Sequence, residues 1–295
     1  MYWTNFPTTA YAASILLILA FINLFLPIKT KLKIILANSL TIIALIIFII
    51  FLIGLWIHLN RPPLRTLGET RLWYAVFLIL IGIITFNRWK YFWFLAFSNF
   101  MSLVFILINL FHPETYNKTL MPALQSYWFV PHVIVYILSY AVLGVSWLVA
   151  IKGLIKSYTK LNLFGKIISF IFFPLFFIIE ILSDEKNENS EKILKISDNI
   201  VYIGFAFLTL GITFGALWAK EAWGNYWTWD PKETWALLTF LVYLIYMHLR
   251  THYKYRTKLH LWILSISFVF LLSAWFGVNY MPSAKNSVHT YSQTE

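Results

Sequence analysis

The chain has no cysteine and few charged residues, and each shortage excludes a class of protein. Without a thiol, its 295 residues hold no disulfide, thiol relay or thiolate metal site, so any bound metal needs histidine, carboxylate or a partner. Asp, Glu, Lys and Arg make up only 12% of the residues and hydrophobic side chains 60%, a balance that excludes a soluble globular fold. The residue alternation of an outer-membrane β-barrel is also missing.

Apolar runs of about 18–22 residues, each long enough to cross a bilayer as a helix, recur along the chain. The run at 10–26 has no basic segment before it and no small-residue cleavage site, so we expect a retained span and not a signal peptide. We predict an all-α polytopic membrane protein, a single integral membrane domain over residues 1–295. Its transmembrane helices, about eight, are expected at 10–27, 34–55, 72–86, 91–110, 131–151, 199–218, 233–249 and 259–277.

The net charge of +11 would point to nucleic acid in a soluble domain, but here the basic residues are spread over the loops between apolar runs. We therefore expect no nucleic-acid partner. Alternate loops collect 16 Lys and Arg on one side of the membrane and 7 on the other, and the richer side is predicted to be cytoplasmic. We expect the cell inner (plasma) membrane, with several passes and both termini on the extracytoplasmic side.

One further apolar segment, 163–182, is predicted to lie at the interface or to form a re-entrant hairpin. A full crossing there would turn the basic loop 250–258 to the outside, against the charge rule. Pro174 in its middle favours a broken helix, and the polar run 183–189 after it is typical of a solvated loop. We expect residues 153–198 to form a cytoplasmic or interfacial insert.

Residues 223–235 are unusual because four of the chain's 14 tryptophans fall within them, between two apolar runs. An interfacial aromatic belt explains one or two tryptophans at a helix end, but not a group of this density. We predict an extracytoplasmic tryptophan-rich loop at 219–235 that forms a flat aromatic platform for a large planar ligand. Its binding surface is expected to include Trp223, Trp227 and Trp229.

Asp230 is predicted to open the helix that follows this loop. An aspartate at the N-cap, Pro231 at the first helical position and Glu233 at the third are typical of a capping box. This gives Asp230 a sufficient structural role, while its position next to Trp229 leaves a ligand-binding role open.

Two of the seven histidines are predicted at the depth of the tryptophan-rich loop. They are His132, at the start of its span, and His289, in the outer tail. Neutral imidazole is the commonest metal ligand, and two such residues beside an aromatic surface can hold a haem iron axially. The alternative for each is an ordinary interfacial histidine.

His248 lies near the other end of the helix that the loop opens. It follows Trp229 by 19 residues, or about 28 Å of helix, close to the thickness of one bilayer core. An imidazole at the edge of a span is a candidate ligand, and its alternative is an interfacial residue beside Arg250. The remaining histidines lie at span ends or in a basic loop and are assigned no ligand role: His58, His112, His252 and His260.

The pattern Trp-Gly-x-x-Trp-x-Trp-Asp-Pro-Lys-Glu-Thr at 223–234 resembles the tryptophan-rich signature (WWD domain) of haem-handling proteins in cytochrome c maturation. The chain as a whole looks like the CcsA (ResC) family, the membrane subunit of the system II cytochrome c synthase. The segment 163–182 departs from the family pattern. The likeness otherwise covers most of the chain, including Pro62–Thr70, the His132 segment, Met247–Arg250 and Gly277–Tyr280 before His289.

The resemblance implies a haem lyase for which haem b is the transported substrate. His132 and His289 would then correspond to the two outer axial ligands of the haem iron. His248 would correspond to a membrane-embedded ligand, whose second histidine comes from a CcsB (ResB) partner. Arg61 stands where many relatives have a histidine, and its guanidinium suits a haem propionate.

The reaction that the resemblance implies joins haem vinyl groups to the thiols of a Cys-x-x-Cys-His motif in apocytochrome c. The substrate protein must bring both thiols, because this chain has none. The chain is therefore expected to position haem and to contain no catalytic residue. Apocytochrome c and the CcsB-type protein are the expected partners, and proteins of a thiol-reducing pathway are further candidates.

Two other functions stay open. A system I-type haem chaperone or exporter shares the tryptophan signature and an outer histidine pair. A polytopic transporter of another aromatic or anionic solute predicts no haem at all. Eight spans together with His248 favour the synthase over the system I-type protein.

Overall fold

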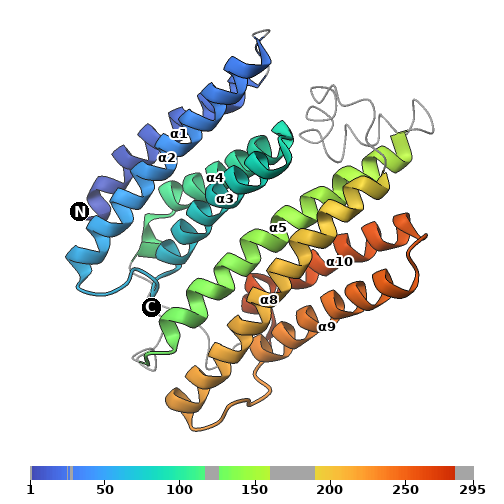
Figure 1. Ribbon diagram of the computed structural model, residues 1–295. Coiled ribbons are helices and arrows are strands. Elements are labelled where there is room, and N and C mark those ends of the chain that lie inside the picture. The colour runs from blue at the N-terminus through green and yellow to red at the C-terminus, as the bar shows by residue number, and fades with distance from the viewer. Residues whose placement is uncertain (1, 25, 27–28, 117–125, 160–189, 283–295) are drawn as a thin grey trace. The chain divides into compact units, whose positions relative to one another are not determined.

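The computed structural model describes residues 2–24, 26, 29–116, 126–159 and 190–282, which form eight long α-helices (Figure 1). No strand occurs in these ranges. Short 3₁₀ turns stand at Trp3–Asn5 (η1), Pro113–Tyr116 (η2) and Gly277–Tyr280 (η4). The helices are α1 (Phe6–Asn23), α2 (Thr30–Leu59), α3 (Leu67–Trp89), α4 (Phe92–Phe111), α5 (Phe129–Thr159), α8 (Ser190–Trp223), α9 (Pro231–His252) and α10 (Thr257–Trp275).

Seven of these helices are long and apolar enough to cross a membrane. Among the described helices α9 is the exception, because its 22 residues include the charged side chains of Lys232, Glu233 and Arg250. All eight expected spans coincide with a long helix, and most helices extend beyond the expected bounds. The prediction of an all-α polytopic membrane protein is confirmed.

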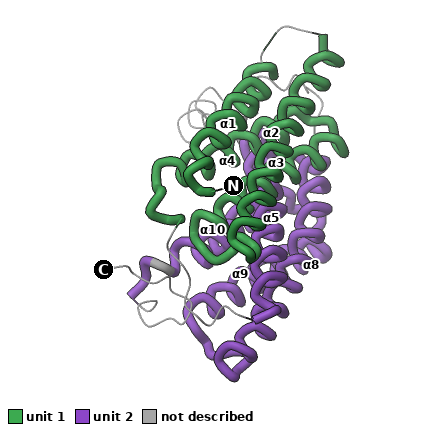
Figure 2. The backbone as a smooth tube through the Cα atoms, turned by 90° about the vertical axis from the view of Figure 1, so that its left-hand side faces the viewer, with its two compact units in different colours: residues 1–121, 291–295 green, residues 122–290 purple. Residues whose placement is uncertain are grey.

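The chain divides into two compact units, residues 1–121 with 291–295 and residues 122–290 (Figure 2). In unit 1, α1 packs on α2 and α4, and α3 packs on α4. In unit 2, α5 packs on α8 and α10, and α10 packs on α9. That the two units act as one membrane domain over residues 1–295 stays a prediction.

Unit 1 joins its helices through a few buried polar contacts. The Asn99 amide donates to the Thr41 hydroxyl (2.9 Å), and the Asn109 amide donates to the backbone carbonyl of Gly68 (2.8 Å). Each of these side chains is essentially inaccessible, so the hydrogen bond compensates for burying a polar group among apolar ones. These contacts tie α4 to α2 and α3.

Unit 2 is built on the close approach of α8 to α5. Three glycines of α8 each receive one α5 side chain, and a Cβ added to them would meet that side chain at 2.5–2.8 Å. Small residues let helix backbones approach closely. Such contacts are common in membranes, because lipid tails are as apolar as the side chains and give no hydrophobic driving force for helix association. The three contacts are Leu143 on Gly204, Tyr136 on Gly211 and His132 on Gly215.

The order of these contacts makes α5 and α8 antiparallel, as Figure 1 shows, so Thr159 and Ser190 lie at the same end of the pair. The predicted insert must begin and end on the same side of the membrane, and these two positions agree with that requirement. The segment 163–182 itself lies outside the described residues, as do all residues from 160 to 189.

The bounds expected for the insert, 153–198, differ from the structure at both ends. Residues 153–159 continue α5, and residues 190–198 already belong to α8. The first turns of α8 are too polar for a hydropathy pattern to include them, yet Ile193 and Leu194 are fully buried. The apolar face of an amphipathic helix therefore extends α8 beyond its uniformly apolar part.

A cluster of charged and polar side chains joins the start of α8, the end of α9 and the start of α10. Arg250 of α9 donates through Nε to Asp198 (2.9 Å) and through Nη2 to Glu191 (3.0 Å), both on α8. Tyr246 also donates to Asp198 (2.7 Å), and Thr257 of α10 donates to Glu191 (2.9 Å). Since Arg250 is only 9% exposed, these bonds replace its lost hydration.

Replacing Arg250 by alanine is expected to destabilise unit 2 by about 3 kcal/mol, because the two carboxylates of α8 lose the cation that balances them. Unfolding of the purified full chain in detergent measures the loss. Lys254→Ala is the control, because its exposed side chain should leave stability within about 0.5 kcal/mol. Equal stability of the two variants would show that the cluster contributes little.

Candidate functional site

The tryptophan-rich loop is shorter than the predicted 219–235. Residues 219–223 are the last turn of α8 and residues 231–235 the first turn of α9, so the loop proper is 224–230. Gly224 (φ 82°) and Trp229 (φ 61°) adopt left-handed backbone conformations, which turn the chain sharply at both ends of the loop. Lys220 donates to the Gly224 carbonyl (2.7 Å) and lies 5.5 Å from the ring of Tyr226.

Glu233 fixes the shape of this loop. Its Oε2 accepts hydrogen bonds from the Thr228 amide (2.7 Å), the Thr228 hydroxyl (3.3 Å) and the Asp230 amide (3.1 Å). Asp230 in turn accepts from the Lys232 amide (2.9 Å), which completes the predicted capping box. The structural role of Asp230 is confirmed, and its role in ligand binding stays a prediction.

The charges at the start of α9 influence one another. Burial lowers the pKa of Lys232 to about 8, and the neighbouring Asp230 carboxylate limits that fall.

The tryptophan rings do not form the flat platform that the sequence suggested. Trp227 and Trp229 meet edge to face, with centroids 6.0 Å apart and planes at 85°. Trp223 meets Trp218, one turn earlier in α8, at 4.8 Å and 62°. Trp229 is 69% exposed. The rings of each of these two pairs therefore lie in different planes.

His132, in the first turn of α5, occupies the space beside Gly215 of α8. A Cβ on Gly215 would lie 2.8 Å from its Cε1 and 2.9 Å from its Nδ1. The imidazole also stacks on Trp218, with centroids 5.6 Å apart and planes at 24°. Through Trp218, the structure brings His132 next to Trp223, the first residue of the tryptophan-rich stretch.

The backbone of α8 orients the His132 ring. Nδ1 of His132 lies 2.7 Å from the carbonyl oxygen of Gly211. Because a carbonyl only accepts, Nδ1 must carry the proton, and the neutral ring then presents its lone pair at Nε2. Metal-binding histidines are commonly oriented in this way, with one ring nitrogen donating to a backbone carbonyl.

His248 is found at the opposite end of α9 from the loop. It is exposed on the described part of the chain, and its ring lies 4.4 Å from that of His252, one turn further on. From Asp230 to His248 the helix spans about 27 Å, close to the thickness of one bilayer core. Arg250, two residues beyond His248, is held by the charge cluster, so the last turns of α9 have a fixed orientation.

His289 and Arg61 are the remaining residues that the sequence suggested for haem binding. His289 lies outside the described residues, so its partnership with His132 stays a prediction. Arg61, suggested for a haem propionate, is bound by Glu69 in unit 1 through two hydrogen bonds of 3.0 and 2.9 Å. Within the described ranges, no group of three or more His, Cys, Asp or Glu is placed to hold a metal ion.

Three residues of the site were missed by reasoning from the sequence. Gly211 and Gly215 carry no chemical group that a motif search singles out, and their only signal is a spacing of four on one helix face. Trp218 lies just outside the dense tryptophan stretch, although it precedes Trp223 by five residues. Each of the three belongs to the site only because a side chain of α5 packs against it.

Comparison with known proteins identifies one family, that of cytochrome c assembly proteins. The family model described as cytochrome C assembly protein matches residues 8–284. Curated relatives named cytochrome c biogenesis protein CcsA include one from Manihot esculenta, 33% identical over 264 residues, which cover 82% of each chain. Another from Marchantia polymorpha is 33% identical over 261 residues, with 80% of this chain and 82% of the relative covered. A third from Nicotiana tomentosiformis is 37% identical over 185 residues, 59% of each chain.

Gly215→Ala is expected to displace the His132 ring, because the new methyl group would overlap it and weaken the bond from Nδ1 to the Gly211 carbonyl. In ¹⁵N-histidine NMR spectra of the full chain, the signal of the Nδ1-protonated tautomer should decrease. Gly277→Ala is the control, since its Cβ meets Ser273 at an ordinary 3.4 Å. An unchanged tautomer in Gly215→Ala would contradict this account of the ring's orientation.

Glu233→Ala removes the acceptor of three loop hydrogen bonds, at a cost of about 1–2 kcal/mol. Hydrogen exchange at the Thr228 and Asp230 amides should then accelerate about 5- to 30-fold. Glu69→Ala is the matched control, because Glu69 closes the same kind of capping box at the start of α3. It should leave these two amides unaffected, and equal acceleration in both variants would refute a local role for Glu233.

Proposed function

Because this chain belongs to the cytochrome c assembly protein family, we propose that it is the membrane subunit of a system II cytochrome c synthase. It is a multi-pass membrane protein of cytochrome c biogenesis. The finer proposal is that it binds haem and presents it for attachment to apocytochrome c. The observation that carries this proposal is His132, oriented by the Gly211 carbonyl and stacked on Trp218, whose ring meets that of Trp223.

The outer haem site consists of His132, His289 and the tryptophans of the WWD signature. His132 supplies one axial ligand through Nε2, and His289 supplies the other. Trp223, Trp227 and Trp229 contact the faces and edges of the porphyrin, which suits their inclined arrangement. Two histidine ligands keep the iron six-coordinate until the histidine of the substrate motif displaces one of them.

His248 marks an inner site at the opposite end of α9. It is exposed on this chain, and a histidine at the edge of a membrane segment requires a polar partner. A CcsB-type membrane protein covers this side of α9 and supplies the second iron ligand. Haem then passes from the inner to the outer site along about 27 Å of helix.

The attachment reaction itself needs no acid or base from this chain. Each substrate thiol adds across one haem vinyl group, the sulfur bonding to one vinyl carbon and the hydrogen to the other. The chain has no cysteine, so both thiols come from the apocytochrome and are kept reduced by a thiol-reducing pathway. What this chain contributes is position: iron held by two histidines, the porphyrin held by tryptophans, and the vinyl edge left accessible.

The proposed location is the cell inner membrane, with the tryptophan-rich loop and both termini on the extracytoplasmic side. The excess of Lys and Arg in alternate loops supports this orientation. The antiparallel pairing of α5 and α8 supports it as well, because residues 159 and 190 lie at one end. This end is the one that carries the Arg250 cluster and His248.

The absorption spectrum of the full chain, purified with its CcsB-type partner, tests this function. The wild-type complex should show a Soret band of six-coordinate haem. His132→Ala and His289→Ala should each change the outer-site spectrum and lower cytochrome c yield about tenfold or more, and His248→Ala should remove inner-site haem. His58→Ala, which alters an exposed histidine of unit 1, should change nothing. A haem-free wild type with normal cytochrome c yield in the variants would favour a transporter of another solute.

A further inference from the structure

Two histidines lie one turn apart on the same face of α9, at the end opposite the tryptophan-rich loop. The rings of His248 and His252 have centroids 4.4 Å apart and planes inclined by 49°. Both side chains are exposed, and His252 is the last residue of the helix. The proposed function uses only His248, so the second imidazole has no role there.

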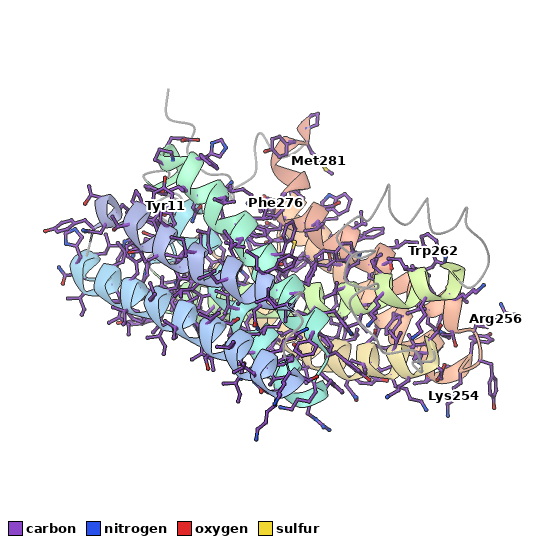
Figure 3. All side chains as sticks on the ribbon, turned by 90° about the horizontal axis from the view of Figure 1, so that it is seen from above. Tyr11, Lys254, Arg256, Trp262, Phe276 and Met281 are labelled. Atoms are coloured by element: carbon purple, nitrogen blue, oxygen red, sulfur yellow. The ribbon has the colours of Figure 1, made fainter. Side chains whose placement is uncertain are left out.

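The loop after His252 adds positive charge and aromatic surface. Lys254 and Arg256 are exposed, and Figure 3 labels them at the end of unit 2 where α9 leads into α10. Tyr255 is 99% exposed, and Tyr253 is 54% exposed with the Arg256 guanidinium 5.9 Å from its ring. An iron porphyrin offers what these groups bind: a metal for imidazole, a flat ring for aromatic side chains and two carboxylates for cations.

We propose that this end of α9 is a loading site for haem, in which His252 binds the iron first and passes it to His248. The inference rests on the proposed function, because it takes haem as the transported substrate. It adds an entry ligand that precedes the inner site.

The two histidines must act in succession. A haem held between them would need both nitrogens about 2.0 Å from the metal on opposite faces, and hence ring centroids about 6 Å apart. The rings are 4.4 Å apart and project from one side of one helix, so both approach the same face of the porphyrin. Exchange from one to the other moves the iron by about 6 Å along the helix axis.

The exchange is a ligand substitution without net redox change. The bond from iron to the His252 nitrogen breaks as the bond from iron to the His248 nitrogen forms. Both rings stay neutral, no proton is transferred, and the iron keeps its oxidation state. Because the Arg250 cluster fixes the last turns of α9, the two rings stay on one face throughout.

Neighbouring groups do not replace His252 in this role. His260, near the start of α10, is fully buried and faces the ring of Tyr246, so incoming haem cannot reach it. The carboxylates of Glu191 and Asp198 are bound to Arg250. His252 is thus the imidazole nearest the basic loop on the exposed face of α9.

Rapid mixing of haemin with the full chain, purified in detergent with its CcsB-type partner, tests the relay by absorbance. In the wild type, the final spectrum of haem bound by His248 and the partner's ligand should form through a faster first species with one histidine ligand. His252→Ala should slow formation of the final spectrum about tenfold and leave its end point unchanged. His252→Met should restore part of the rate, because a thioether also binds haem iron. His248→Ala should stop the reaction at the first species.

His58→Ala serves as the control and should match the wild type. If His252→Ala forms the final spectrum at the wild-type rate, or if it loses the end point itself, the relay is wrong while the proposed function stands. If the wild-type complex with the CcsB-type partner binds no haemin under any of these conditions, the relay and the haem-binding function both fail.

Discussion

The close packing of α5 on α8 is the constraint on which the rest of unit 2 depends. Glycines 204, 211 and 215 let the backbones approach, and the last of them makes room for the His132 ring. The same pairing fixes the direction of α8, and with it the position of Asp198 at the far end. One helix pair therefore places an imidazole at one end and the charge cluster that anchors α9 at the other.

The helix α9 runs between these two ends of the α5–α8 pair, and different hydrogen bonds hold it at each end. At its start, Glu233 gathers three hydrogen bonds from the loop and holds the tryptophans in their inclined arrangement. At its end, Arg250 binds two carboxylates of α8 and holds the histidine face in place. These charged residues lower the mean hydropathy of α9, which is the cost of anchoring a helix at both ends. The proposed path of haem follows α9, whose start and end are both held by these hydrogen bonds.

Much of the fold could be predicted from the sequence, because a long apolar run in a membrane has few structures other than a helix. The start of α9 could also be predicted, since the bonds of a capping box are formed by neighbours in the chain. The arrangement of the tryptophan rings could not, because it depends on the backbone conformations of Gly224 and Trp229. Gly215 and Trp218 could not be identified either, because their importance comes from His132 on another helix.

The most direct test of this account is an experimental structure of the haem-loaded chain with its partner. The account predicts haem beside the tryptophan-rich loop, with iron bound to Nε2 of His132 and Nδ1 still donating to the Gly211 carbonyl. A second haem, in molecules caught before transfer, should lie against the exposed face of α9 at His248. Haem bound away from both ends of α9, or iron on a ligand other than His132 at the outer site, would contradict it.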